Sequence, residues 1–226
     1  MTRIAVLISG RGSNMVELAR HIQTAELSAE ICLVAGSTQC EGLYLAAERG
    51  LPTSLFDLAK FADRYAQETA LADALEKAGA EWIFLAGYMA ILSPTFVNRF
   101  AGKIVNIHPS LLPNFRGLNT HARALAAGET WHGATVHIVN EKLDGGQILL
   151  QAGLKIATDD TVESLASRVL TLEHMLYPFV LGALITGNLQ IKEGIPHWWD
   201  TETTLASLNS AMREFLEEHA IWPESL

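Results

Sequence analysis

Cysteine is nearly absent: Cys32 and Cys40 are the two in a chain of 226 residues. Two cysteines cannot build a disulfide framework, and neither lies at metal-ligand spacing from other candidate ligands. Cys32 falls inside an apolar run, where a free thiol behaves as a small hydrophobic side chain. We therefore predict buried or incidental thiols in a protein of a reducing compartment.

Basic residues are also scarce, and neither terminus carries a basic run. Lys and Arg number 16 against 25 Asp and Glu, so the formal net charge is −9. This balance disfavours binding along a nucleic-acid backbone, although it permits a local basic pocket for one phosphate. We expect no nucleic-acid partner.

Long hydrophobic runs are missing as well. The run Ile4–Ile8 near the N-terminus stops at glycines, and it is too short for a signal-peptide core or a membrane span. Later apolar segments meet charged residues before they reach spanning length. The sequence therefore predicts no membrane partner and a cytoplasmic location.

Apolar residues make up 49% of the chain and charged residues 18%, which is enough to bury a substantial core. In the first half, short apolar runs alternate with helical patterns that end at glycines. Such runs are typical of strands covered on both faces, and the alternation favours an α/β fold with a doubly wound, mostly parallel sheet. The expected strands are Ile4–Ile8, Ile31–Ala35, Thr53–Phe56, Trp82–Ala86 and Ile104–Ile107.

The second half has a different pattern. Two strand-like runs, Ala134–Val139 and Gln147–Ile156, flank a loop with adjacent glycines and predict an antiparallel excursion. A long helix is expected over Val162–Leu184, kinked or shortened by Pro178. We divide the chain into one domain, residues 1–189, and a C-terminal appendage, residues 190–226, packed on it. The appendage is predicted to hold a short strand and an amphipathic helix with Leu205, Leu208, Met212 and Phe215.

Glycines mark the first candidate site, Gly10-Arg11-Gly12-Ser13-Asn14, between the first strand and the first helix. Glycines allow a tight turn, and the helix offers free N–H groups and the positive end of its dipole to a phosphate. A dinucleotide site is disfavoured because Met15 occupies the third glycine position, and Gly36-Ser37-Thr38 supplies no acid for a ribose. The alternative is that the glycines only make the turn.

The second candidate site is the end of the fifth strand, Asn106-Ile107-His108-Pro109. Alternation along a strand points Asn106 and His108 to the same face, and the carboxyl ends of strands line the ligand crevice in doubly wound sheets. A lone His in an apolar run is more often structural. Asn and His together, before a proline-stiffened loop, favour a functional pair.

The third candidate is Asp144 in Leu143-Asp144-Gly145-Gly146. Taken alone, it is more often an ordinary acid in a turn. A carboxylate near His108 would stabilise the protonated imidazole and let it donate a proton. The sequence leaves open whether the two meet.

Other combinations of residues are weaker candidates for a functional site. His132 and His137 lack further ligands at metal spacing, so a surface and a strand histidine are preferred to a metal site. Ser110 lacks the glycine elbow of a hydrolase nucleophile. Trp198-Trp199 is expected to pack the appendage against the domain in preference to stacking on a ligand.

Five motifs at these spacings resemble the formyltetrahydrofolate-dependent formyltransferase family. They are GRGSN (Gly10–Asn14), LAGYM (Leu85–Met89), NIHPSLLP (Asn106–Pro113), GATVH (Gly133–His137) and LDGG (Leu143–Gly146). The resemblance runs from about Arg3 to Leu189 and is strongest to the members that formylate glycinamide ribonucleotide in purine synthesis. It implies a Rossmann-like formyltransferase fold.

The resemblance also implies a mechanism and a set of site residues. The amine of 5'-phosphoribosylglycinamide would attack the formyl carbon of 10-formyltetrahydrofolate, a co-substrate, directly, and no metal is expected. Asn106 and His108 would contact the formyl oxygen, and Asp144 would keep the imidazole protonated. The ribonucleotide would contact Arg11, Gly12, Ser13, Asn14 and Glu173. The folate would contact Arg64, Met89, Ala90, Ile91, Leu92, Asn106, Asn140, Glu141, Lys142, Leu143 and Asp144.

The sequence departs from the family pattern at three places. Ala90 stands where relatives often carry Arg, which removes one expected contact to the folate tail. Arg116-Gly117-Leu118-Asn119 stands where Pro-Gly-Leu-His is common, and Phe115-Arg116-Gly117 is reminiscent of members that act on other amines. The residues after Leu189 exceed what the fold needs. We expect a monomer or a homodimer.

Two rival functions remain at this point. A formyltetrahydrofolate hydrolase of the same fold would use water as acceptor and leave the phosphate cradle idle. A nucleotide-binding module without chemistry would leave the combination of Asn106, His108 and Asp144 unexplained.

Overall fold

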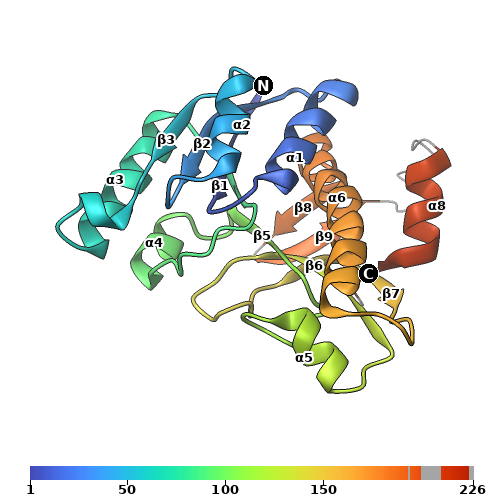
Figure 1. Ribbon diagram of the computed structural model, residues 1–226. Helices are drawn as coiled ribbons and strands as arrows, with labels where there is room; N and C mark the ends of the chain where they lie inside the picture. Colours follow the sequence, from blue (N-terminus) through green and yellow to red (C-terminus); the bar gives the residue numbers. More distant parts are fainter. Residues whose placement is uncertain (193, 200–209, 224–226) are drawn as a thin grey trace. The chain divides into compact units, whose positions relative to one another are not determined.

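The computed structural model describes residues 1–192, 194–199 and 210–223. The chain forms two compact units, whose helices and strands are labelled in Figure 1. Unit 1 comprises residues 1–106 and 139–141, and unit 2 comprises residues 107–138 and the described residues from 142 onward.

Parallel strands form the centre of unit 1. β1 pairs with β2 on one side and with β4 on the other, β3 pairs with β2, and β5 pairs with β4. The last residue pair of the β4–β5 ladder is Leu85 with Asn106. The strands are β1 (Thr2–Ile8), β2 (Ala29–Gly36), β3 (Thr53–Leu55), β4 (Trp82–Leu85) and β5 (Ile104–His108), whose last two residues belong to unit 2.

Helices cover both faces of these strands. Ile4 to Ile8 are fully buried along β1, which explains why the run is continuously apolar. The Asp63 carboxylate accepts the Ala66 N–H at the start of α3, and Ser93, before Pro94, caps α4 in the same way. The helical segments are α1 (Ser13–Thr24), α2 (Glu41–Glu48), the 3₁₀ turn η1 (Leu58–Lys60), α3 (Arg64–Lys77) and α4 (Pro94–Arg99).

Antiparallel strands characterise unit 2. β6 (Trp131–Ile138) pairs with β7 (Ile148–Lys155), and the two-residue β10 (Ala220–Ile221) pairs with the outer edge of β7. β8 (Leu189–Lys192) and β9 (Ile195–Trp198) form a separate antiparallel pair. With the parallel strands of unit 1, these pairings confirm the predicted α/β fold with a mostly parallel sheet and an antiparallel excursion.

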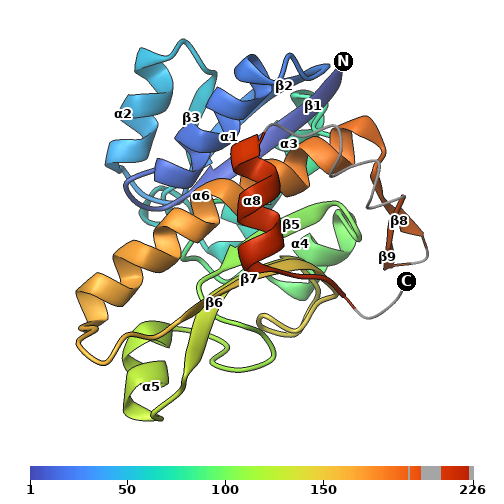
Figure 2. The same cartoon turned by 90° about the vertical axis from the view of Figure 1, so that its right-hand side faces the viewer.

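The long helix α6 (Val162–Thr186) packs on β6 and β7 and forms the core of unit 2 (Figure 2). It continues eight residues past Pro178, so the expectation that this proline shortens the helix was wrong. By length and composition α6 could also cross a membrane, which the sequence analysis did not anticipate, but its most apolar window is 56% buried inside the protein. Burial of this kind is typical of a core helix.

A short helix, α5 (Thr120–Ala126), was not predicted. It begins after Asn119, whose φ of +57° is left-handed and whose side chain makes no capping hydrogen bond. Its sequence offers few large apolar residues, so its hydrophobic periodicity is weak. It packs on α6 within unit 2.

The segment after Gly187 contacts the rest of unit 2 through aromatic side chains. Trp198 stacks on Phe179 of α6 with ring centroids 5.7 Å apart, and its indole N–H donates to the Leu149 carbonyl. Trp222 meets Trp198 edge-on at 4.9 Å. The division at residue 189 stays a prediction.

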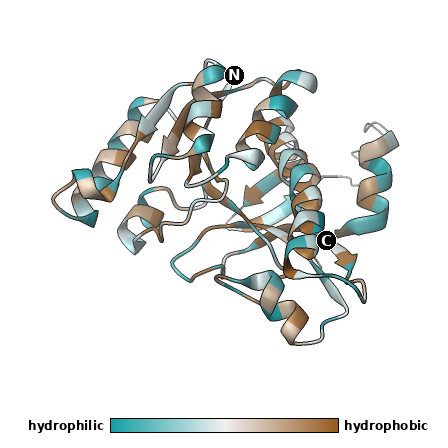
Figure 3. Cartoon of the chain, viewed as in Figure 1, coloured by the Kyte–Doolittle hydropathy of each residue, from teal (hydrophilic) through white to brown (hydrophobic). Residues whose placement is uncertain are grey.

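The predicted amphipathic helix is found as α8 (Ser210–His219), along which hydrophilic and hydrophobic bands alternate (Figure 3). Met212 and Phe215 lie in it, whereas Leu205 and Leu208 fall outside the described residues. α8 contacts β7, and the His219 Nδ1 atom lies 3.0 Å from the Gly153 carbonyl oxygen.

Candidate active site

In unit 1, the predicted phosphate loop lies at the carboxyl end of β1. Gly12 immediately precedes α1 and has φ +78°, a left-handed conformation that favours glycine. A Cβ on Gly12 would lie 2.6 Å from the Gly42 Cα in the first turn of α2, so the two backbones approach too closely for a side chain. Packing therefore already requires glycine here, and the α1 N-terminus has no side-chain cap and no acid in its first turn.

The loop that carries the predicted folate contacts Met89–Leu92 lies beside the first. The Met89 N–H donates to the Ser9 hydroxyl at 2.9 Å, and Ser9 also pairs with Ser37 at 2.6 Å. Strand order reverses at this point, because β1 has β2 on one side and β4 on the other. The carboxyl ends at such a reversal are where open α/β sheets bind ligands.

Apolar side chains project from the second loop. Met89 is 69% exposed and Ile91 67% exposed, which is unusual for large apolar residues that lie close together. Ala90 is exposed between them. The loop therefore presents an apolar surface suited to a planar ring system.

One carboxylate ties this loop to Arg64. The Glu68 Oε1 atom accepts from Arg64 Nε at 2.9 Å and from the Ser93 N–H at 3.0 Å, and the second oxygen bonds the Ser93 hydroxyl. Burial and then the Glu68 charge raise the pKa of the nearby Tyr88 to about 12. Glu141, also predicted to contact folate, accepts a hydrogen bond from the Asn98 side chain at 2.7 Å.

The catalytic candidates of unit 2 are His108 and Asp144, and the structure brings them together. The His108 Nδ1 atom lies 3.5 Å from Asp144 Oδ2, and both side chains are at least 90% buried. Asp144 has φ +45°, a left-handed conformation that Asp tolerates better than most residues. The structure thus places a carboxylate beside the imidazole, which the sequence could suggest only by resemblance.

Two backbone groups of the loop after His108 hold this pair. The Phe115 carbonyl oxygen lies 3.0 Å from His108 Nε2, and the Gly117 N–H donates to Asp144 Oδ2 at 2.8 Å. Because a carbonyl oxygen can only accept, Nε2 carries a proton and Nδ1 is the nitrogen turned toward the carboxylate. Neither Phe115 nor Gly117 was predicted as a site residue, since backbone contacts leave no side-chain pattern.

A second imidazole, that of His137, also faces Asp144. Its Nε2 lies 3.8 Å from Asp144 Oδ1, and its Nδ1 lies 3.0 Å from the Ile138 carbonyl. Burial is the main cause that lowers the pKa of His137. A neutral His137 bonded through Nδ1–H turns its unprotonated Nε2 toward Asp144, so it offers the carboxylate no proton. From the sequence, His137 of the GATVH motif was expected only as a structural strand histidine.

Two further histidines lie behind the loop. His121 Nδ1 and His132 Nε2 are 3.1 Å apart, and the His132 ring meets the Phe115 ring edge-on. Burial lowers the pKa of His132 to about 4, and burial followed by the His108 charge lowers the pKa of His121. Both are neutral near pH 7 and share one hydrogen bond. Across the described part of the chain, no group of three or more His, Cys, Asp or Glu side chains is placed to hold a metal ion.

Side chains of β6 and β7 brace the first half of the same loop. The buried Thr135 hydroxyl donates to the Ser110 carbonyl and accepts from the Leu112 N–H and from the Gln151 amide. The Gln151 amide also donates to the Leu112 carbonyl. All the hydrogen-bonding capacity of the Thr135 hydroxyl is therefore used.

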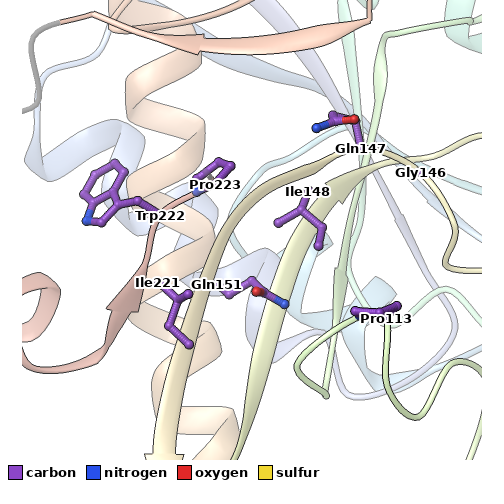
Figure 4. A pocket seen from close by; sticks show the side chains of 8 residues that line it. All are labelled: Pro113, Gly146, Gln147, Ile148, Gln151, Ile221, Trp222 and Pro223. Atoms are coloured by element: carbon purple, nitrogen blue, oxygen red, sulfur yellow. The ribbon is translucent and has the colours of Figure 1, made fainter. Parts of the chain in front are cut away.

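A cavity of about 530 Å³ lies in unit 2 next to this brace (Figure 4). It is open between the start of β7 and the chain after β10, and it includes neither His108 nor Asp144. Its lining residues are Pro113, Gly146, Gln147, Ile148, Gln151, Ile221, Trp222 and Pro223.

Sequence comparison places this arrangement among known proteins. The profile described as formyl transferase matches residues 2–181. The chain belongs to the formyl transferase family. This formyl transferase is 40% identical over 198 residues to the phosphoribosylglycinamide formyltransferase of Haemophilus influenzae, with 87% of this chain and 93% of the relative covered.

Solved structures of similar proteins also belong to formyltransferases and related enzymes. The phosphoribosylglycinamide formyltransferase of Coxiella burnetii, solved in complex with CHES, superposes on this formyl transferase with a TM-score of 0.83. The two are 40% identical, with 87% of this chain and 93% of that chain covered. A formyltetrahydrofolate deformylase from Burkholderia mallei is less similar, at 28% identity and a TM-score of 0.79, with 88% of this chain and 70% of that chain covered.

The predicted site residues divide between the two units. Unit 1 holds the loops after β1 and β4, Arg64, Asn106, and Asn140 with Glu141; unit 2 holds His108, the segment Lys142–Asp144, and Glu173, which is buried on α6. His108 and Asp144 lie together within unit 2. The roles of all these residues remain proposals.

Proposed function

We propose that this formyl transferase moves the formyl group of 10-formyltetrahydrofolate to the amine of 5'-phosphoribosylglycinamide, a step of purine biosynthesis. The observation that carries the proposal is the buried His108–Asp144 pair, held by the Phe115 carbonyl and the Gly117 N–H, in a chain so similar to formyltransferases of this substrate. We further infer a cytoplasmic enzyme in which formyl-folate is a co-substrate and no metal takes part.

The chemistry follows from the two nitrogens of His108. The substrate amine attacks the formyl carbon, and negative charge develops on the formyl oxygen. The Nε2–H group of His108 donates to the Phe115 carbonyl, so Nδ1–H is the donor that remains for the formyl oxygen. Its distance of 3.5 Å to Asp144 Oδ2 allows this proton to be shared between the carboxylate and the formyl oxygen. Asp144 stabilises the imidazolium, and the Asn106 amide supplies a second donor to the oxyanion, as alternation along β5 suggests. The folate nitrogen departs with the electron pair of the broken C–N bond and takes up a proton that the amine releases.

Binding is assigned to the remaining candidates. The ribonucleotide phosphate is held by backbone N–H groups of Gly12–Asn14 and by Arg11, and Glu173 binds its ribose. The folate ring lies against the apolar surface of Met89–Leu92 and contacts residues 140–144. Arg64, oriented by Glu68, pairs with the acidic tail.

A single assay tests the function and separates it from hydrolysis. The protein is incubated with 10-formyltetrahydrofolate, with and without 5'-phosphoribosylglycinamide, and folate absorbance is followed. Turnover that requires the amine supports the transferase. Turnover that ignores the amine overturns it in favour of the deformylase chemistry of the Burkholderia relative, and absence of turnover favours a binding module.

A further inference from the structure

Arg123 of α5 makes three contacts, all to one short loop. Its Nη1 atom donates to the Arg116 carbonyl at 2.6 Å and to the Leu118 carbonyl at 3.2 Å. Its guanidinium carbon lies over the Phe115 ring, 5.5 Å from the centroid. Helical side chains lean toward the N-terminus of their helix, so Arg123, the fourth residue of α5, reaches back over the chain that precedes the helix.

The loop that Arg123 contacts also forms hydrogen bonds to His108 and Asp144. The Phe115 carbonyl is the partner of His108 Nε2, and the Gly117 N–H is a donor to Asp144. Phe115 itself has φ +55°, which is unfavourable for a bulky residue and needs support from its surroundings. Arg123 stacks on the Phe115 ring, and the edge of His132 also packs against it.

We propose that Arg123 is a positioning residue for formyl transfer, which clamps the loop Phe115–Leu118 and thereby sets the geometry of both His108 and Asp144. The inference rests on the proposed function for its catalytic consequence. A planar guanidinium can bond two carbonyls and stack on a ring at the same time, whereas a lysine ammonium cannot do all three. Arg123 touches none of the reacting groups itself.

The test compares Arg123→Ala and Arg123→Lys with Arg49→Ala. Arg49 is a matched control, because it is an exposed arginine whose Nη1 also donates to a backbone carbonyl, that of Leu45, on a helix with no predicted role. Misplacement of catalytic groups by about 1 Å can cost about 100-fold in rate, so Arg123→Ala should lower kcat by about 10- to 100-fold. KM for both substrates should change little, Arg123→Lys should retain part of the rate, and Arg49→Ala should match the wild type.

Two further measurements separate positioning from general loss of structure. Added methylguanidinium should restore part of the activity of Arg123→Ala, because it can bind in the space left by the arginine side chain. In protein with ¹⁵N-labelled histidine, the Nε2–H resonance of His108 should move in Arg123→Ala and stay in place in Arg49→Ala. An unchanged kcat with an unmoved His108 resonance overturns the proposal, as does a rise in KM alone.

The outcomes also separate this inference from the proposed function. If the wild-type protein fails to formylate the ribonucleotide, the function is wrong, while the His108 resonance still reports whether Arg123 sets the imidazole. If the wild type is active and both Arg123 variants keep its kcat, the function stands and the positioning role is wrong.

Discussion

The candidate residues of unit 1 and those of unit 2 are different kinds of groups. Apart from Asn106 at the end of β5, the candidates of unit 1 are backbone N–H groups and apolar side chains in the loops after β1 and β4, together with Arg11 and Arg64, and these groups suit binding. In unit 2 the catalytic candidates are His108 and Asp144, two buried side chains that lie side by side and that backbone groups of Phe115 and Gly117 hold in place. The difference predicts that changes at His108 and Asp144 act on kcat, whereas changes in the loops after β1 and β4 act on KM or on stability.

The largest effect should follow from His108→Ala. Loss of a general acid and oxyanion donor should reduce kcat by about 1,000-fold, measured in the formyl-transfer assay. The affinity for the ribonucleotide, measured by calorimetry, should stay close to that of the wild type. Loss of ribonucleotide binding would contradict the catalytic role, because it would make His108 a structural residue of the binding site.

Asp144→Asn should have a smaller effect on the same step. The amide oxygen can still accept the Gly117 N–H, but the charge that stabilises the imidazolium is gone, so kcat should fall by about 100-fold. Gln147→Glu, a change of charge in the nearby cavity, serves as a control that should leave kcat in place. An Asp144→Asn enzyme of wild-type kcat would mean that Asp144 only holds the loop.

The catalytic candidates Asn106, His108 and Asp144 also show how much of the site could be predicted from the sequence. Asn106 and His108 lie two apart on one strand, so strand alternation is enough to relate them. His108 and Asp144 lie far apart in sequence, and only family resemblance joined them. The contacts from Phe115 and Gly117 involve backbone groups in left-handed conformations, and hydrophobic periodicity does not encode such contacts. The strands of unit 1 could be predicted, because a strand that is buried on both faces has a continuous run of apolar residues in the sequence.

Gly12→Ala tests what the glycines of unit 1 are for. An added Cβ meets both a left-handed φ and the Gly42 backbone at 2.6 Å, so the free energy of unfolding should fall by about 2–4 kcal/mol in urea titrations. Gly50→Ala is the matched control, with φ +70° and open space around its Cβ, and should lose about 1 kcal/mol. Equal losses would show that the Gly12–Gly42 contact does not restrict the loop.

In the folded variant, KM for the ribonucleotide should rise with little change in kcat. The phosphate is proposed to bind the N–H groups that follow Gly12, and a shifted loop misaligns them. A fall in kcat at unchanged KM would give the loop at Gly12 a part in the chemical step and contradict its proposed role in binding.

The smallest expected effect concerns the histidines behind the loop of unit 2. Burial lowers the pKa of His132 to about 4, and the pKa of His121 is also lowered. The unfolded chain therefore binds protons that the folded chain resists, so their contribution to stability is complete above about pH 6.5 and is lost as the pH falls toward 4. In urea titrations at pH 7.5 and 5, His132→Phe should lose less stability on acidification than the wild type. His197→Gln, at an exposed position on β9, should follow the wild type, and an identical acid sensitivity in His132→Phe would show that the buried pair does not set it.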